Sequence, residues 1–452
     1  MKISQLVSKM HFVSVFILMF SVFLTNAQEK LSLKEAINYA LENKADAKKA
    51  KLTTQNAENE IAEVRSQALP QVSLSGNLIY NPILQESALP GEFFDQPGTT
   101  ILVPFGQEWM AIGGVNISQN IFNYSVFTGL KAARSTREFY QVNQQLTEEQ
   151  VIEAVANSFY QVFIAKQKLE TVEITLENTI KVQNTVQGLF DNGLARKIDL
   201  DRIKVGVVNL NSSKQQLINQ VQLQENMLKF LIGMPINTPI VIEEEIVEVV
   251  PVLIENPDVK ELSAYQLLTK QKDLLTYNKQ AIVAGYYPTL SVSGNYSYQG
   301  IGDAFPLSGA KPSDGVYWTD YASVNLNLSI PIFTGFNIRS KVRMAQYQLD
   351  IIDQELKDAE LALNFSFENS KSQINNSVMT INSQEQNVKL AEEVFVNTQN
   401  NYINGLASLT DLIDAENALA DARNNYSNAL LEYKLAEIQL IKAQGKLQSL
   451  IN

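Results

Sequence analysis

The sequence contains one unit twice, and this repeat limits the folds that the chain can adopt. The segment Asn192-Gly-Leu-Ala195 returns as Asn404-Gly-Leu-Ala407, and Asp199-Leu200 returns as Asp411-Leu412. Both matches have the same offset of about 212 residues. A constant offset between two matches indicates an internal duplication of the chain.

Apolar residues spaced alternately four and three apart follow the second of these turns, which is typical of a coiled-coil seam. They are Ala415, Leu419, Ala422, Tyr426, Ala429, Tyr433, Ala436, Leu440, Ala443 and Leu447. The same offset leads back to a largely apolar set in the first half, namely Ile203, Val207, Leu210, Lys214, Leu217, Val221, Gln224, Leu228 and Leu231. The duplication therefore extends through the helices.

Each copy is predicted to run as helix, strand, long loop, strand, very long helix, tight turn and helix. The first repeat covers 28–240, with a strand pair at 70–123, a long helix at 124–190 and a helix at 199–233. The second covers 241–452, with a strand pair at 288–334, a long helix at 337–401 and a helix at 409–448. The long segments contain no proline, and each would extend about 100 Å.

A capping box, Ser32 with Glu35, predicts the start of the first helix, which would run to Ala68 before Pro70. Together with the helix at 199–233 it would match one long helix in length. We therefore expect two shorter helices to lie end to end beside each continuous one.

The N-terminal residues 1–27 are predicted to be a secretory signal, with two lysines, an apolar stretch and a small-residue cleavage site. The chain has no cysteine, and its single histidine, His11, lies within that signal. The mature chain would then lack Cys and His nucleophiles, imidazole bases and nearly all zinc or copper sites. We predict no enzyme activity and no cofactor or metal site, and the net charge of −12 argues against nucleic acid as a partner.

Four short segments alternate apolar residues with small uncharged polar ones, and one of them recurs: Leu69 to Asn77 resembles Tyr287 to Asn295. The alternation fits either a half-buried soluble sheet or membrane strands whose polar side faces a water-filled lumen. Trp109 and Trp318, the only tryptophans, favour the membrane because both lie near strand ends among tyrosines, as in an interfacial aromatic belt. No segment after the signal is apolar enough for an ordinary transmembrane helix.

Four strands cannot close a barrel, and open strand edges cannot persist in lipid. Three copies of the chain would supply twelve strands, an even number within the known range. Two copies would supply eight, whose side chains fill the interior. The smallest assembly that leaves a usable pore is therefore a homotrimer.

Several motifs, taken together, resemble the TolC family of outer-membrane efflux and secretion channels. They are Leu31 to Ile37, Ile121-Phe122, Pro331 to Gly335, Phe190 to Ala195 followed by Asp199-Leu200, and Tyr402 to Ala407 followed by Asp411 to Asp414. The resemblance implies a mainly α protein with β strands. Its trimer would form a 12-stranded β-barrel in the outer membrane, continuous with a long α-helical coiled-coil barrel in the periplasm. It also implies a passive duct, opened when a periplasmic adaptor protein and an inner-membrane pump or ABC transporter dock.

Asp411 and Asp414 match the family's constricting aspartates, and at three residues apart they share one helix face. A trimer would place six such carboxylates around a narrow opening, which should repel anions and favour cations. The alternative for Asp411 is a first-turn acid that stabilises the start of its helix. Both interpretations can hold together.

The family also joins neighbouring hairpins through polar contacts, and Tyr402 and Asp199 match two of those positions. The arginine that some members carry is replaced by Ala407, while Arg196 lies one position further on in the first copy. The turn residues match the place where adaptors dock, namely Gly193, Leu194, Gly405 and Leu406. The glycines also serve to end a helix, so only the leucines are expected to act in docking.

Two other functions compete with the duct. A periplasmic adaptor would carry a single coiled-coil hairpin, whereas this chain carries two together with membrane-type strands. A hydrolase could use the acidic run Glu243 to Glu245, but consecutive acids point in different directions and usually form a solvated face.

Overall fold

The computed structural model describes residues 30–243, 254–306 and 312–451. The predicted signal at 1–27 lies outside these residues. The described chain divides into two compact units, and each unit draws on both sequence repeats. The first comprises Met1–Lys51, Asn143–Tyr265 and Ala359–Asn452, and the second comprises Leu52–Val142 and Gln266–Asp358.

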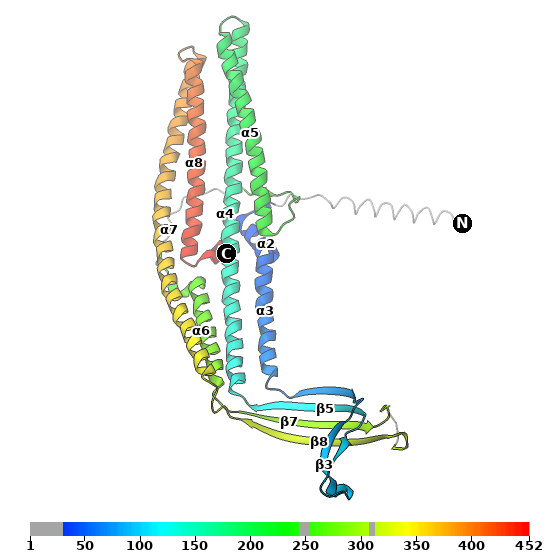
Figure 1. Cartoon of the computed structure of the whole chain (residues 1–452). Coiled ribbons are helices and arrows are strands. Elements are labelled where there is room, and N and C mark those ends of the chain that lie inside the picture. Colours follow the sequence, from blue (N-terminus) through cyan, green and yellow to red (C-terminus); the bar gives the residue numbers. More distant parts are fainter. Residues whose placement is uncertain (1–29, 244–253, 307–311, 452) are drawn as a thin grey trace, which may run out of the picture. The chain divides into compact units, whose positions relative to one another are not determined.

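Four helices dominate the first unit, and two of them continue into the second. α4 spans Tyr124–Asp191 and α7 spans Asn337–Ile403, with 68 and 67 residues. The shorter partners are α5, Lys197–Ile232, and α8, Leu409–Ala443. Figure 1 shows α5 returning beside α4 and α8 returning beside α7, each after a tight turn. The long helices agree with the predicted ranges to within two residues.

The predicted seam of the second repeat forms the core between these helices. Nine of its ten residues are buried, and Tyr433 and Leu440 are fully buried. The seam of the first repeat is less covered within one chain, since only Ile203 and Leu228 of its nine residues are buried. Partial burial leaves apolar surface on α5 that this single chain does not cover.

The prediction of one continuous first helix over 32–68 is wrong, because the helix breaks at Lys44. The capping box of Ser32 and Glu35 opens α2, Leu33–Asn43, and α3 follows at Ala45–Ser66. Lys44 has an extended backbone, and its Nζ donates to the carbonyl of Phe230 at 3.1 Å. That oxygen belongs to the last turn of α5, whose carbonyls lack partners within the helix. The break thus joins the end of α5 to the α2–α3 junction.

Short elements complete the first unit. A parallel pair joins β1, Lys30–Leu31, to β6, Val241–Ile242. α8 ends at Ala443, earlier than the predicted 448, because the amides of Gly445 and Lys446 bond back to the carbonyls of Lys442 and Ile441. The turn is followed by the 3-10 helix η5, Leu447–Leu450, and another 3-10 helix, η3, covers Val259–Glu261.

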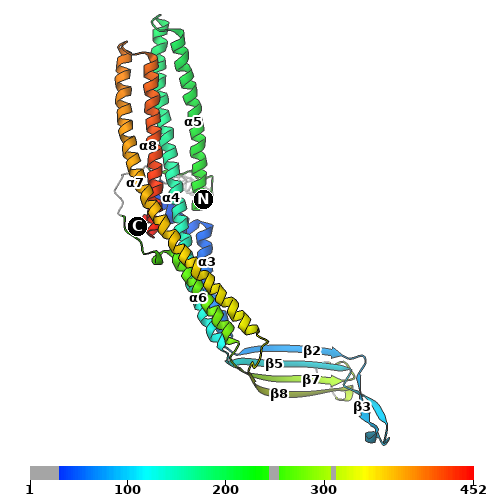
Figure 2. The ribbon, with the colours of Figure 1, turned by 60° about the vertical axis from the view of Figure 1, so that its left-hand side comes forward.

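The second unit contains the four predicted strands in one antiparallel sheet of order β2-β5-β7-β8 (Figure 2). Their bounds are β2 Gln71–Tyr80, β5 Trp109–Phe122, β7 Thr289–Gly302 and β8 Val316–Ser329. The central pair β5–β7 joins the two sequence repeats. The unit also holds α6, Ser263–Ala284, apart from its first residues, and the 3-10 helix η4, Pro312–Asp314.

The long loop expected within the strand pair at 70–123 is not simply a loop, because it contains a second hairpin. β3, Gln85–Pro90, pairs with β4, Thr100–Phe105, across the 3-10 helix η2, Gly91–Phe94. Pro90 and Pro104 argue against strands in the sequence. Each strand of a two-stranded sheet has a free edge, however, and a proline is tolerated there.

Candidate functional site

One face of the four-stranded sheet is apolar and uncovered within the chain. Leu74 on β2 is 80% exposed and Val324 on β8 is 82% exposed. A half-buried soluble sheet would cover such residues with another layer. This face therefore has no partner among the described residues.

Two stacked aromatic pairs lie at one end of that face. Tyr80 stacks on Trp109 with ring centroids 4.3 Å apart, and Tyr298 stacks on Trp318 at 5.0 Å. The register pairs Tyr80 with Trp109 and Gly300 with Trp318 across neighbouring strands. The two tryptophans thus lie near the same end of the sheet.

The opposite face is lined by amides and hydroxyls that bond from strand to strand. Asn116 on β5 donates to Ser75 on β2 at 3.2 Å and accepts from Asn295 on β7 at 2.8 Å. Asn327 on β8 donates to Ser293 on β7 at 3.4 Å. These hydrogen bonds connect neighbouring strands across an uncharged polar face of the sheet.

The turns of the two helical hairpins have the same geometry. Gly193 and Gly405 have φ angles of 72° and 71°, a region that favours glycine. Each following leucine amide bonds back to the helix end, and Leu194 and Leu406 are 76% and 79% exposed. The turns therefore present bare leucines at the hairpin tips.

Asp411 opens α8 in a reciprocal capping box with Ser408. The Asp411 carboxylate accepts from the Ser408 amide at 2.9 Å and from the Ser408 hydroxyl at 2.7 Å. These hydrogen bonds lower the pKa of the Asp411 carboxyl. Asp414 is exposed one turn further along the same helix. Asp411 thus takes part in capping the start of α8, and its carboxyl group remains exposed at the surface.

The hydrogen-bond partner of the Asp199 carboxylate is Arg196, not Tyr402. The Arg196 guanidinium donates to both Asp199 oxygens, at 2.9 and 3.1 Å, and this pair lowers the pKa of the Asp199 carboxyl. Burial, followed by the charge of Asp199, raises the pKa of the Tyr402 hydroxyl. Arg196 is therefore the partner of Asp199, although its side chain is 79% exposed.

A contact that the sequence did not suggest joins the two hairpins. Arg202 Nη1 on α5 donates to Thr410 Oγ1 at the start of α8 at 2.6 Å. The sequence repeat could have drawn attention to Arg202, because this residue occupies the position equivalent to Asp414. The first copy thus carries a cation where the second carries an acid.

A second unpredicted residue, Glu416, lies inside the helical unit. It is 8% exposed, and Thr179 Oγ1 donates to its carboxylate at 3.0 Å. Burial raises the pKa of the Glu416 carboxyl, and the Thr179 hydrogen bond opposes this effect. Glu416 borders a cavity of about 310 Å³ between α4, α5 and α8.

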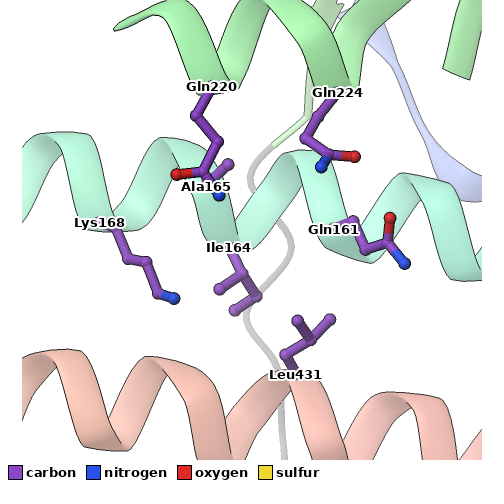
Figure 3. A pocket seen from close by; sticks show the side chains of 7 residues that line it. All are labelled: Gln161, Ile164, Ala165, Lys168, Gln220, Gln224 and Leu431. Carbon is purple, nitrogen blue, oxygen red and sulfur yellow. The ribbon is translucent and has the colours of Figure 1, made fainter. Parts of the chain in front are cut away.

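Another cavity, of about 230 Å³, lies further along the same three helices (Figure 3). Lys168 on α4 points toward α8 and donates to Asn428 at 2.5 Å. Gln220 and Gln224 reach in from α5. Burial lowers the pKa of the Lys168 ammonium. The single charge lining this cavity thus already has a partner.

Solved outer-membrane proteins share the fold of this chain, with the same order of helices and strands. VceC from Vibrio cholerae superposes with a TM-score of 0.71 at 17% identity, over 91% of this chain and 96% of that chain. The CmeC channel of Campylobacter jejuni gives 0.72 at 14% identity, over 92% and 85%. No helix among the described residues is long and apolar enough to cross a membrane.

The sequence comparison gives the family. The family described as outer membrane efflux protein matches residues 36–234 and 253–446, so the chain belongs to that family. The outer membrane protein TolC of Vibrio cholerae serotype O1 is 23% identical over 422 residues, covering 92% of this chain and 91% of that protein. TolC of Escherichia coli is 22% identical over 402 residues, covering 86% and 76%. The resemblance read from the motifs is confirmed, and these relatives are channel proteins, not enzymes.

Proposed function

We propose that three copies of this chain form an outer-membrane exit duct for a tripartite efflux pump or a type I secretion system. The observation that carries the proposal is the four-stranded sheet, which has two unpaired edges, β2 and β8, and an uncovered apolar face. Open edges cannot persist in lipid, so the edges must pair with other copies.

The strand directions favour closure by identical copies. All neighbouring strands are antiparallel, and their even number makes β2 and β8 run in opposite directions. β8 of one copy can therefore pair with β2 of the next without breaking the antiparallel order. Three copies give twelve strands, enough to enclose a lumen lined by the asparagine and serine face.

The apolar face has the height of a bilayer. Trp318 and Leu328 bound this face of β8, which is apolar apart from Asp320 beside Trp318, and the ten steps between them rise about 34 Å along the strand. A tilt of about 40° reduces that to about 26 Å, close to the apolar band of outer-membrane barrels, about 25 Å. Trp109 and Trp318 would then lie at one membrane interface and contact lipid headgroups.

The helices also carry surface that further copies would cover. Several large apolar side chains stand exposed along the continuous helix α7, away from its buried seam; they are Leu361, Phe365, Met379 and Leu390. Exposed apolar residues at helical spacing are typical of a coiled coil that lacks its partner. A homotrimer would bury them against α5 of the neighbour, forming the helical barrel that we assign to the periplasm.

The hairpin tips would form the gate. Asp411 and Asp414 from three copies would surround the opening with six carboxylates. Ser408 favours the ionised form of Asp411 within one chain, whereas the neighbouring carboxylates would act in the opposite direction. Tyr402, Asp199 and the Arg202–Thr410 bond would hold the hairpins together at rest.

Opening requires partners. Leu194 and Leu406 are bare apolar side chains at the turns, and we assign them to docking of a periplasmic adaptor protein, with Gly193 and Gly405 shaping the turns. The adaptor would connect the duct to an inner-membrane pump or ABC transporter. The duct itself needs no cofactor, because it supplies a path and the pump supplies the energy.

The test measures mass and current on the purified full-length protein in detergent. We expect a trimer by light scattering and a small, cation-selective current in planar bilayers that divalent ions block. The double variant Asp411→Asn with Asp414→Asn should raise conductance and weaken the divalent block. Asp201→Asn removes an exposed carboxylate from α5 and serves as the control.

Two results would contradict the proposal. A water-soluble monomer without current would favour the periplasmic coiled-coil adaptor instead. A trimeric channel whose conductance is unchanged in the double aspartate variant would retain the duct but remove the gate assignment.

A further inference from the structure

The buried carboxylate of Glu416 lines a cavity and is not paired with the one cation of the lining, Arg202. Thr179 is its hydrogen-bond partner, and no ion pair to Glu416 occurs among the described residues. A buried ionised carboxylate is costly unless a cation or several donors compensate it. Glu416 therefore lacks the paired cation that would compensate its charge.

The cavity lining suits a small organic ion, in which one charged group is attached to an apolar skeleton. Its lining also includes the uncharged polar residues Thr175, Asn209 and Ser213. Ile203 and Leu210 supply apolar wall on α5. The volume of about 310 Å³ is within the range of pockets that hold small organic ligands.

The other charged residue of the lining does not neutralise Glu416. Arg202 donates to Thr410 at the start of α8, and this bond holds its guanidinium toward the hairpin tips. The residues contributed by α4, Thr175 and Thr179, are uncharged, and so is Asn417 on α8. Glu416 is thus the single acid of the cavity.

We propose that this cavity is a binding site for a small amphipathic ammonium ion, with Glu416 as the counter-ion and the α5 side chains as the apolar wall. The site lies within one chain and is distinct from Asp411 and Asp414 at the surface. A ligand there would touch α5 of one hairpin and α8 of the other. On the proposed function, it would therefore stabilise the arrangement in which the two hairpins are close.

Protons must compete with such a ligand. Burial raises the pKa of the Glu416 carboxyl, so acid removes the negative charge at a higher pH than for an exposed glutamate. The hydroxyls and amides of the lining do not titrate in that range. Affinity should accordingly fall as the pH is lowered through the raised pKa of Glu416.

The experiment measures binding of cyclohexylammonium to the full chain in detergent by titration calorimetry, with cyclohexanol as the uncharged probe. We expect saturable binding of the ammonium alone. Glu416→Gln keeps the shape and the Thr179 contact and should weaken binding by at least roughly tenfold. Asp421→Asn, an exposed acid on the same helix, should leave the affinity unchanged.

A second variant separates a cavity from simple charge attraction. Gly206 lines the cavity, and a Cβ there would meet only the Thr179 methyl group, at 4.0 Å. Gly206→Leu keeps Glu416 but fills part of the cavity, so it should also weaken binding, and an affinity equal to that of the wild type would overturn the site. Equal affinity in the wild type and Glu416→Gln, or loss of affinity in Asp421→Asn alone, would overturn the site.

The pH dependence in the wild type tests the same site without a variant. Affinity that does not fall with acid would overturn the role of Glu416. Binding needs neither membrane nor pump, so its outcome is distinguishable from that of the duct. A protein that binds the ammonium but passes no current would contradict the duct and leave the site standing.

Discussion

The hydrogen bond between Arg202 and Thr410 joins the two hairpins, and its removal should open the channel. The donor is a guanidinium and the acceptor a hydroxyl, 2.6 Å apart at the surface. Hydrogen bonds to charged groups contribute about 1.5–3 kcal/mol, and solvent exposure reduces this to about 1 kcal/mol. Three copies of the bond in a trimer would then favour the closed state by about 3 kcal/mol, or roughly 150-fold in the closed-to-open equilibrium.

The perturbation is Arg202→Ala, and the assay is open probability in planar bilayers. Thr410→Val removes the acceptor while keeping the side-chain shape, and the double variant completes a cycle that isolates the pair. We expect each single variant to raise open probability and the double variant to add little. Lys204→Ala, an exposed cation on the same helix, should have no effect. Strictly additive effects of the two single variants would refute the reasoning.

Three further predictions concern stability, read as thermal unfolding of the full chain by circular dichroism. Leu440→Ala should destabilise the helical unit by about 2–5 kcal/mol, because Leu440 is fully buried in the seam; an unchanged midpoint would contradict that packing. Gly405→Ala should cost about 1 kcal/mol at its φ of 71°, whereas Gly188→Ala, inside α4, should be neutral or stabilising; equal effects would exclude the turn geometry as the cause. Asp411 has a lowered pKa, so its contribution is present above the ordinary value of 3.8 and is lost as pH falls through the folded pKa. Ser408→Ala should therefore make acid destabilisation shallower, and an identical pH profile would argue against the capping box.

The extent of a helix could be predicted from the sequence where a helical period of apolar residues coincides with a segment free of proline. α4 was expected at 124–190 and spans Tyr124–Asp191. The break at Lys44 was not accessible, because neither proline nor glycine marks it and its cause is the distant carbonyl of Phe230. The β3–β4 hairpin was missed since its prolines mimic a loop.

Some residues of the candidate site could be predicted from the sequence, and others could not. The turns, the aspartates and the tryptophans stand in motifs whose spacing points to them. Glu416 adjoins the seam residue Ala415 and looks like any polar residue beside a coiled-coil stripe. Only the packing of α4, α5 and α8 buries it and gives it a cavity.

The sequence by itself determined the duplicated order of elements, the seams and the two faces of each strand, because these follow from local periods of two and of three and a half residues. The tertiary structure decided which strands are neighbours, with β5 against β7, and which helix ends meet. It also paired Arg202 with Thr410 and enclosed Glu416. Such contacts join residues from 168 to 237 positions apart, and no local period of a chain encodes which distant groups come together.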